Sequence, residues 1–279
     1  MPKIITILIV IFYSSPLLSE KIITLDKVTN SVVIDGLIEE SEWASSKVVE
    51  DFVEINPGIK NLPALARTKV RVAYDNKNLY IAFKAFDDRE LIRANQSKRD
   101  DIADDDRVIV SIDPRNDGVV SHYFSSNPFG NQLDGQKLGN SERDNWDAIW
   151  YSSGNITEDG YEVEMAIPFS TFRSANTDGL NWRINFLRFI PRKEGVRIDS
   201  WVPIDRDNTC NPCQFGYLKG INDVDIKSPI ELLPSIVGSS EDSFSSSLGF
   251  GISFPIGETA TAEVTLNPDF SQVESNETK

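Results

Sequence analysis

The chain has 279 residues, of which 28 are Lys or Arg and 43 are Asp or Glu, so its formal net charge is −15. Such an acidic surface repels phosphate backbones, which excludes nucleic acid as an expected partner. Fifteen Phe, seven Tyr and five Trp supply enough apolar area for a substantial core, and the length allows one large sandwich or two smaller units.

The N-terminus has the pattern of a secretory signal. Lys3 precedes an uncharged apolar run over residues 4–13, and Ser14, Ser15 and Pro16 follow it. The run is too short to span a bilayer as a helix and fits a signal peptide over residues 1–19, cut after Ser19. A buried N-terminal helix is the alternative, but no cap is visible. We therefore expect a mature protein that is secreted across the inner membrane to the periplasm or outer membrane.

The first half of the mature chain contains short strand patterns. Residues 32–34 lead into a turn, and residues 39–44 predict a helical turn that carries Trp43. Residues 68–74 and 79–86 alternate on either side of a four-residue turn, which predicts a β-hairpin. Residues 107–113 also alternate, before Pro114.

The clearest strand pattern lies at residues 161–167. Alternate residues from Tyr161 to Ile167 are apolar, while Glu162 and Glu164 point to the opposite side, as in a half-buried strand. Pro168 suits the first turn of a short helix. Further strands are expected at residues 121–125, 148–152, 182–190 and 196–202. Many short strands without a long helical period predict an all-β fold of the β-sandwich class.

Near residue 222 the composition changes, and three further strands are expected at residues 229–237, 247–254 and 258–266. The last strand has small apolar residues on one face (Ala260, Ala262, Val264, Leu266) and polar residues on the other (Thr259, Thr261, Glu263, Thr265). This is typical of a membrane β-barrel strand, although an ordinary hairpin packed on the sandwich fits equally well. A barrel needs about eight strands, so residues 223–279 would hold only its first strands and the chain would be a truncated piece.

The two cysteines stand together as Cys210-Asn-Pro-Cys213. A zinc site needs about four ligands, and the chain offers no second CxxC and a single histidine. A redox CxxC normally opens a helix in a βαβ unit, which is absent from the pattern. In an oxidising compartment a small structural disulfide is the expected state.

An acidic run precedes the strand at residues 107–113. Its carboxylates, from Asp100, Asp104, Asp105 and Asp106, are hard oxygen ligands of the kind that calcium prefers, but the EF-hand spacing is missing. A solvated acidic turn is the alternative, as is pairing of Asp106 with Arg107 or Arg99.

Six segments occur in an order that resembles a known family: IDGLIEESEWASS, RTKVRVAYDNKNLYIAFKAFD, DDDRVIVSID, NPFGNQLDG, WDAIW and YEVEMAIPFSTF. Together they resemble the family 9 carbohydrate-binding module, in the version fused to an uncharacterised outer-membrane β-barrel domain. The final TLNPDFSQVES resembles the start of that barrel. The resemblance implies a jelly-roll-like β-sandwich over residues 22–222 that binds sugars, often attached to glycoside hydrolases, with calcium in characterised members.

Modules of this family hold a sugar between two tryptophans. A pyranose stacks its apolar face on an indole, and its hydroxyl groups need planar polar partners. The candidate platforms are Trp146, Trp150 and Trp201, and the candidate hydroxyl partners are Arg99, Asn127, Gln132 and Asp134. Burial is the alternative for each tryptophan, as we expect for Trp43 and Trp182. On a strand, the spacing of Trp146 and Trp150 would put both indoles on one face.

No catalytic signature is present in the sequence. It contains no GxSxG elbow, HExxH, P-loop or dinucleotide fingerprint, and His122 lies in a strand-like segment where a structural role is expected. Non-catalytic glycan capture is therefore the main hypothesis, with any hydrolysis of O-glycosyl compounds left to a partner domain. The rival hypotheses are a structural plug or assembly domain for a barrel, without a sugar ligand, and an accessory domain of a glycoside hydrolase system.

Overall fold

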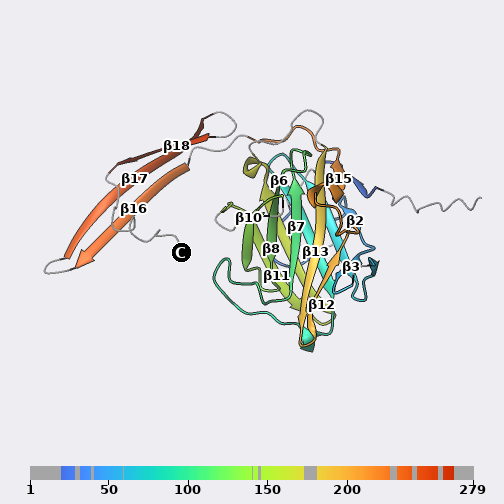
Figure 1. The fold of residues 1–279 in the computed structure, drawn as a ribbon. Coiled ribbons are helices and arrows are strands. Elements are labelled where there is room, and N and C mark those ends of the chain that lie inside the picture. Colours follow the sequence, from blue (N-terminus) through green and yellow to red (C-terminus); the bar gives the residue numbers. More distant parts are fainter. Residues whose placement is uncertain are drawn as a thin grey trace, which may run out of the picture.

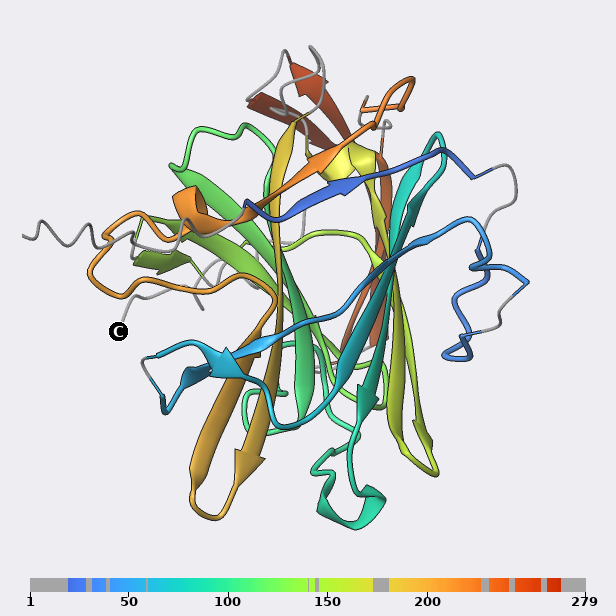
Figure 2. The same cartoon turned by 90° about the vertical axis from the view of Figure 1, so that its right-hand side faces the viewer.

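The computed structural model describes residues 20–28, 32–38, 41–58, 60–139, 141–143, 146–172, 181–226, 231–240, 244–256 and 260–266. The signal-peptide prediction for residues 1–19 and most of the TLNPDFSQVES segment lie outside these residues. Two β-sheets face each other and form a sandwich, and a third sheet follows in the chain (Figures 1 and 2).

The larger sheet of the sandwich has ten strands. Its main path runs β10 (Ser141–Arg143), β9 (Gln132–Leu138), β8 (Val120–Ser126), β7 (Arg107–Asp113), β13 (Trp182–Arg192), β14 (Gly195–Ser200), β3 (Val53–Asn56) and β4 (Leu62–Pro63). β15 (Gly216–Lys219) pairs with β13, and β1 (Ile22–Thr24) runs parallel to β15. The other pairings are antiparallel, as expected for strands joined by short turns.

The smaller sheet has five strands in the order β11 (Tyr151–Thr157), β12 (Gly160–Pro168), β6 (Asn78–Phe86), β5 (Thr68–Tyr74) and β2 (Lys47–Val49). The predicted β-hairpin is confirmed as β5 and β6. Asp75 closes its turn, because the carboxylate accepts the backbone N–H groups of Lys77 at 2.7 Å and Asn78 at 2.8 Å. Three short 3₁₀ helices complete the sandwich: η1 (Arg89–Leu91), η2 (Phe169–Thr171) and η3 (Pro212–Gln214).

The core lies between the facing sheets and follows the period-two pattern. Alternate residues of the central strands are fully buried, such as Val108, Val110 and Ile112 of β7. Trp182 is also fully buried in this core, as predicted. Phe172 packs edge-on against it, with 4.9 Å between the ring centroids.

A second, smaller core covers the outer face of the five-stranded sheet. Trp43 is fully buried there, as predicted, on strands β5, β6 and β12. Its Nε1 donates to Glu164 at 2.8 Å, and the same carboxylate accepts the N–H groups of Asp35 at 3.1 Å and Gly36 at 3.0 Å. The interpretation of β12 as half-buried is therefore wrong at Glu164, which is fully buried because the N-terminal segment folds over it.

Two further predictions need correction. The strand predicted at residues 148–152 begins only at Tyr151, as β11, and residues 32–34 do not form a strand. Strands β1 to β4, β9, β10 and β15 were not predicted, since β9 and β10 are largely polar and the others have at most four residues.

Cys210 and Cys213 form a disulfide beside the turn that follows β7. Asp113 holds this turn, since its carboxylate accepts N–H groups from Arg115, Asn116 and Gly118. Gly118 has φ +72°, and a Cβ atom there would lie 2.5 Å from the Cys213 sulfur. The disulfide therefore packs directly against a position that only glycine fits.

The third sheet contains β16 (Glu231–Ser240), β17 (Phe244–Ile256) and β18 (Ala260–Leu266), whose strands pair only with one another (Figure 1). The register aligns Leu232 with Ile252 and Ile252 with Val264, so these residues share one face. Large apolar side chains on the sheet are exposed, namely Leu232, Leu248, Phe250, Val264 and Leu266. Among the described residues, none of the helices has the length and apolarity to cross a membrane.

Candidate functional site

The outer face of the ten-stranded sheet carries a groove of about 620 Å³. Its floor comes from residues that alternate with the core residues of β7, β8, β9 and β13, such as Ile109, Tyr123, Leu133 and Leu187. Loop residues on either side, including Ala103 and Phe215, form its walls. The groove combines apolar and aromatic side chains with a few polar groups, which is the usual composition of a ligand site.

Tyr123 lines this groove, is 9 % exposed, and has Gly135 as its cross-strand partner. A Cβ atom on Gly135 would lie only 2.5 Å from the Tyr123 Cζ atom, so the ring occupies the space above the glycine. A glycine in a strand often marks such a close approach. The pair sets the ring across β9, where it forms part of the groove floor.

Phe189 provides a second ring in the groove. The guanidinium group of Arg107 lies 4.2 Å from its ring centroid, a cation–π arrangement. Arg107 is held in place by hydrogen bonds to the backbone carbonyl groups of Ala103 and Ile102. Burial lowers the pKa of Arg107, although nearby Asp104 and Asp105 oppose the shift.

Two of the three predicted tryptophan platforms face the core. Trp150 is 3 % exposed and Trp201 is 4 % exposed, and both belong to the buried cluster between the sheets. The stacking role predicted for them is therefore wrong in this structure, because a sugar cannot reach a buried indole. Their aromatic neighbours are Phe124 for Trp150, at 5.5 Å, and Phe186 for Trp201, at 5.6 Å.

Trp146 is only partly buried, but it also packs against the core. Its ring lies 4.7 Å from that of His122 and 6.0 Å from that of Phe124. Both tryptophans of the WDAIW segment thus turn inward. With Trp43 and Trp182 fully buried, none of the tryptophans forms a pair that could hold a sugar between two indoles.

Three of the four predicted hydroxyl partners, Arg99, Gln132 and Asp134, form one structural network beside the groove. The Arg99 guanidinium donates to Gln132 Oε1 at 2.5 Å, to Asp134 Oδ1, and to the Ala148 carbonyl group at 2.8 Å. Gln132 donates in turn to the Trp150 carbonyl group at 3.0 Å. These contacts attach the segment before β11 to β9, and they leave few groups free for a ligand.

Asn127 is fully buried, and its amide is satisfied by the protein. Its Nδ2 donates to Asn95 O at 2.9 Å and to Asp105 Oδ2 at 2.8 Å, and its Oδ1 accepts the N–H groups of Phe129 and Asn131. A ligand role predicted for Asn127 is therefore wrong here, because every polar atom of the side chain already has a partner.

The structure does not bring the predicted calcium ligands together. Asp105 accepts hydrogen bonds from Asn95 and Asn127, and Asp106 forms an ion pair with Arg192 at 2.9 Å. Burial raises the pKa of Asp106, although the Arg93 N–H group and Arg192 oppose the shift.

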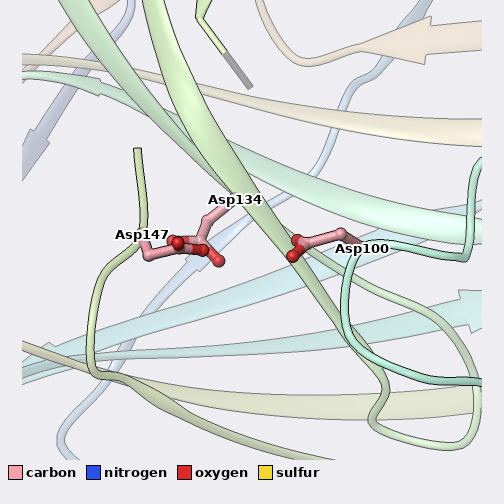
Figure 3. Close-up of side chains that lie close together, drawn as sticks. All are labelled: Asp100, Asp134 and Asp147. Carbon is pink, nitrogen blue, oxygen red and sulfur yellow. The ribbon is translucent and has the colours of Figure 1, made fainter. Parts of the chain in front are cut away.

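A different acidic group is assembled instead. Carboxylate oxygens of Asp100, Asp134 and Asp147 lie within 4.8 Å of one another, as Figure 3 shows. Arg99 occupies this place as the cation, since its Nε lies 4.0 Å from Asp100 and 3.8 Å from Asp147 while it pairs with Asp134. The donor set has the right chemistry for calcium, but it does not fit the ion while the guanidinium is there.

Sequence reasoning missed the aromatic residues that do line the groove, namely Tyr123, Phe189 and Phe215. A signal for two of them was present. Tyr123 and Phe189 alternate with core residues of β8 and β13, so they had to point to the outer face. Their place in a common groove depends on the strand order, which the sequence does not show.

Residues 34–221 match the model of the family described as carbohydrate family 9 binding domain-like. The chain belongs to this family. The sequence matches none of the curated proteins with which it was compared.

Solved structures agree with this family 9 fold. A family 9 carbohydrate-binding module from Caldicellulosiruptor kristjanssonii in complex with cellotriose has a TM-score of 0.51 and 19 % identity, over 71 % of this chain and 93 % of that one. A family 9 module from the same organism in complex with glucose has a TM-score of 0.53 and 18 % identity, over 75 % and 100 %. A protein from Bacteroides uniformis ATCC 8492 has a TM-score of 0.58 and 18 % identity, over 72 % and 99 %. At these identities the similarity establishes the fold alone.

Proposed function

We propose that this family 9 domain binds a glycan without catalysis, and that the glycan lies in the groove on the ten-stranded sheet. The observation that carries the proposal is the groove itself, with Tyr123 and Phe189 on its floor. Aromatic rings can stack on the apolar face of a pyranose, and Lys137 and Glu142 offer polar groups at the rim. The complexes of family 9 modules with cellotriose and glucose support a sugar as the ligand class.

The absence of paired tryptophans changes the expected mode of binding. The register pairs Tyr123 with Ser111 and Ser111 with Asn185, so Asn185 lies level with Tyr123 and two strands away from it. Phe189 lies four residues beyond Asn185 on the same strand. This separates Tyr123 from Phe189 by about 17 Å at ordinary strand spacing and rise. We therefore place an extended oligosaccharide along the groove, with a different sugar unit at each ring.

Calorimetric titration with a panel of oligosaccharides that includes cellotriose tests this proposal. Tyr123→Ala should weaken binding at least about tenfold, since tenfold is 1.4 kcal/mol and burial of an aromatic side chain contributes about 1.5–3 kcal/mol. Tyr123→Phe keeps the ring and should retain most of the affinity. Tyr151→Ala is the control, because Tyr151 is 59 % exposed outside the groove. If folded protein binds no glycan in a diverse panel, the proposal is wrong.

We also propose that the domain is exported and that β16–β18 begin an outer-membrane barrel. The exposed apolar side chains of this sheet support the assignment, as does the length of β16 and β17, which have 10 and 13 residues. A strand that crosses an outer membrane needs about 9–11 residues. A role as a plug or assembly domain of such a barrel is the second candidate function.

Membrane fractionation of a Gram-negative host that expresses this chain together with the further strands of the proposed barrel tests this assignment, because three strands cannot close a barrel. Phe250→Asp and Val264→Asp should move the protein from the membrane to the soluble fraction, since a charge on the lipid face is strongly unfavourable at depth. Wild-type protein that is found entirely in the soluble fraction would contradict the barrel proposal.

A further inference from the structure

A second pocket, of about 700 Å³, lies at one end of the sandwich. The turn of the β13–β14 hairpin, the chain around η1 and the turn before β12 form it, and all three are at the lower end of Figure 2. No residue of the groove lining belongs to this end pocket. The two cavities are therefore separate candidate sites.

The end pocket has apolar walls. Leu65 is 84 % exposed, Leu91 is 52 % exposed and Val196 is 44 % exposed, and all three line the pocket. Ile190 and Phe86 complete the apolar lining. Single exposed apolar residues are ordinary, but a group of them around one cavity indicates a surface that is covered by a ligand or partner.

Two acids of the pocket are already neutralised by basic residues. Asp87 pairs with Arg188 at 2.5 Å and with Arg192 at 2.8 Å. Asp159 pairs with Lys84 at 2.6 Å. These carboxylates therefore contribute little negative charge to the cavity. Glu194 lies exposed at the hairpin turn and is the remaining acid of the lining.

Arg197 is paired with an acid less closely than the basic residues above. Its side chain lines the pocket, and its only ion pair with a described residue is with Asp199, at 3.4 Å from Nε to Oδ1. The Nε atom and both carboxylate oxygens of Asp199 lack a hydrogen-bond partner among the described residues, although Asp199 is fully buried. A buried donor without an acceptor, such as this Nε–H group, is rare in folded proteins and requires an explanation, whereas the Asp199 oxygens are acceptors that an acid ligand would not satisfy.

We propose that the end pocket binds a carboxylate-bearing ligand, with Arg197 as the group that recognises the carboxylate and the apolar wall as the surface that holds the body of the ligand. A planar guanidinium can donate two parallel hydrogen bonds to a carboxylate, which is a strong and specific contact. The acid could be a uronic acid residue of an acidic glycan, whose ring has an apolar face, or a free apolar carboxylate. Both share the same recognition chemistry.

Paired acid and neutral probes distinguish these sources in a calorimetric titration of the protein. One pair is trigalacturonate against a neutral galactose trisaccharide, and the other is benzoate against benzyl alcohol. The acid of at least one pair should bind at least about tenfold more tightly than its neutral counterpart, since a hydrogen bond to a charged group contributes about 1.5–3 kcal/mol. The pair that shows the difference identifies the source.

Two substitutions at the rim should act in opposite directions. Leu65→Glu adds a negative charge to the wall and should weaken acid binding at least about tenfold, whereas Glu194→Gln removes one and should strengthen binding a fewfold. Both residues are exposed, so neither change should affect folding. Leu62→Glu is the matched control, because Leu62 is 60 % exposed but does not line the pocket.

Arg197→Lys keeps a positive charge beside Asp199 but loses the planar fork, so it should weaken acid binding while the thermal midpoint stays near that of the wild type. The proposal is independent of the groove, since Tyr123→Ala should leave acid binding unchanged. Equal binding of acid and neutral probes, or acid binding that Tyr123→Ala abolishes and Leu65→Glu does not affect, would overturn it.

Discussion

Asp199→Asn should make the domain more stable at neutral pH. Asp199 is fully buried on β14, and neither carboxylate oxygen has a hydrogen-bond partner among the described residues. Burial raises the pKa of Asp199 to about 6, although Arg197 and Arg188 oppose the shift. Since the folded state holds the proton more tightly than the unfolded state, Asp199 makes folding less favourable once the pH exceeds its ordinary pKa.

The size of the effect follows from the shift in pKa. An unperturbed aspartate has a pKa of about 3.9, so the shift is about two units, or about 3 kcal/mol at 1.36 kcal/mol per unit. This is an upper limit, because asparagine also removes the counter-ion of Arg197. The free energy of unfolding of the wild type should fall by this amount as the pH rises from about 4 to about 6. Above that range, Asp199 should cause no further loss.

Urea denaturation of both proteins between pH 4 and pH 8 measures the difference. The free energies of unfolding should be nearly equal at about pH 4, and the variant should be about 1–3 kcal/mol more stable at pH 7. Asp207→Asn is the control, since Asp207 is exposed and should show no such trend. A variant that is less stable than the wild type at pH 7 would show that the ion pair with Arg197 outweighs the cost of burial.

Three other substitutions or treatments test the structure. Gly135→Ala should displace the Tyr123 ring, cost about 1–3 kcal/mol in urea denaturation, and weaken glycan binding. His122 is the only histidine, and burial lowers its pKa to about 4, so its NMR signals should not titrate between pH 7 and pH 5. Calcium should leave the thermal midpoint of the wild type unchanged but raise that of Arg99→Gln, where Asp100 and Asp147 lose their cation.

The parts of the fold that the sequence predicts are those with a strong local pattern. The hairpin of β5 and β6 alternates on both strands and has Asp75 at its turn, so local chemistry is sufficient to define it. β9 could not be predicted in the same way. Its sequence QLDGQKL is largely polar and contains Gly135, which is normally unfavourable in a strand.

Glu164 shows why residue pattern alone misassigned one face of β12. An alternating strand predicts a polar, solvated outer face, and a glutamate agrees with that expectation. In the structure, residues from more than 120 positions earlier in the chain cover this face and donate three hydrogen bonds to the carboxylate. Burial still raises the pKa of Glu164, although these donors oppose the shift. Such a long-range contact carries no local signal.

The candidate site was harder to predict than the fold for a related reason. Tryptophan is the residue that most favours sugar stacking, but its large apolar area also favours burial. Trp150 and Trp201 line the core beside Phe124 and Phe186, where each ring has aromatic partners. The type of residue could not separate these outcomes, because both depend on the same apolar surface.

Membership in the family therefore determines less of the binding chemistry than of the fold. The core depends on buried side chains such as Trp182 and Val110, and any chain that preserves their packing can keep the sandwich. The outer face of the sheet is free of this constraint, so its residues can change with the ligand while the strands stay in place. In this chain the groove is lined by Tyr123 and Phe189, and a second cavity is lined by Arg197. Selectivity should accordingly follow these three side chains, and exchanging them should change the preferred ligand without changing the fold.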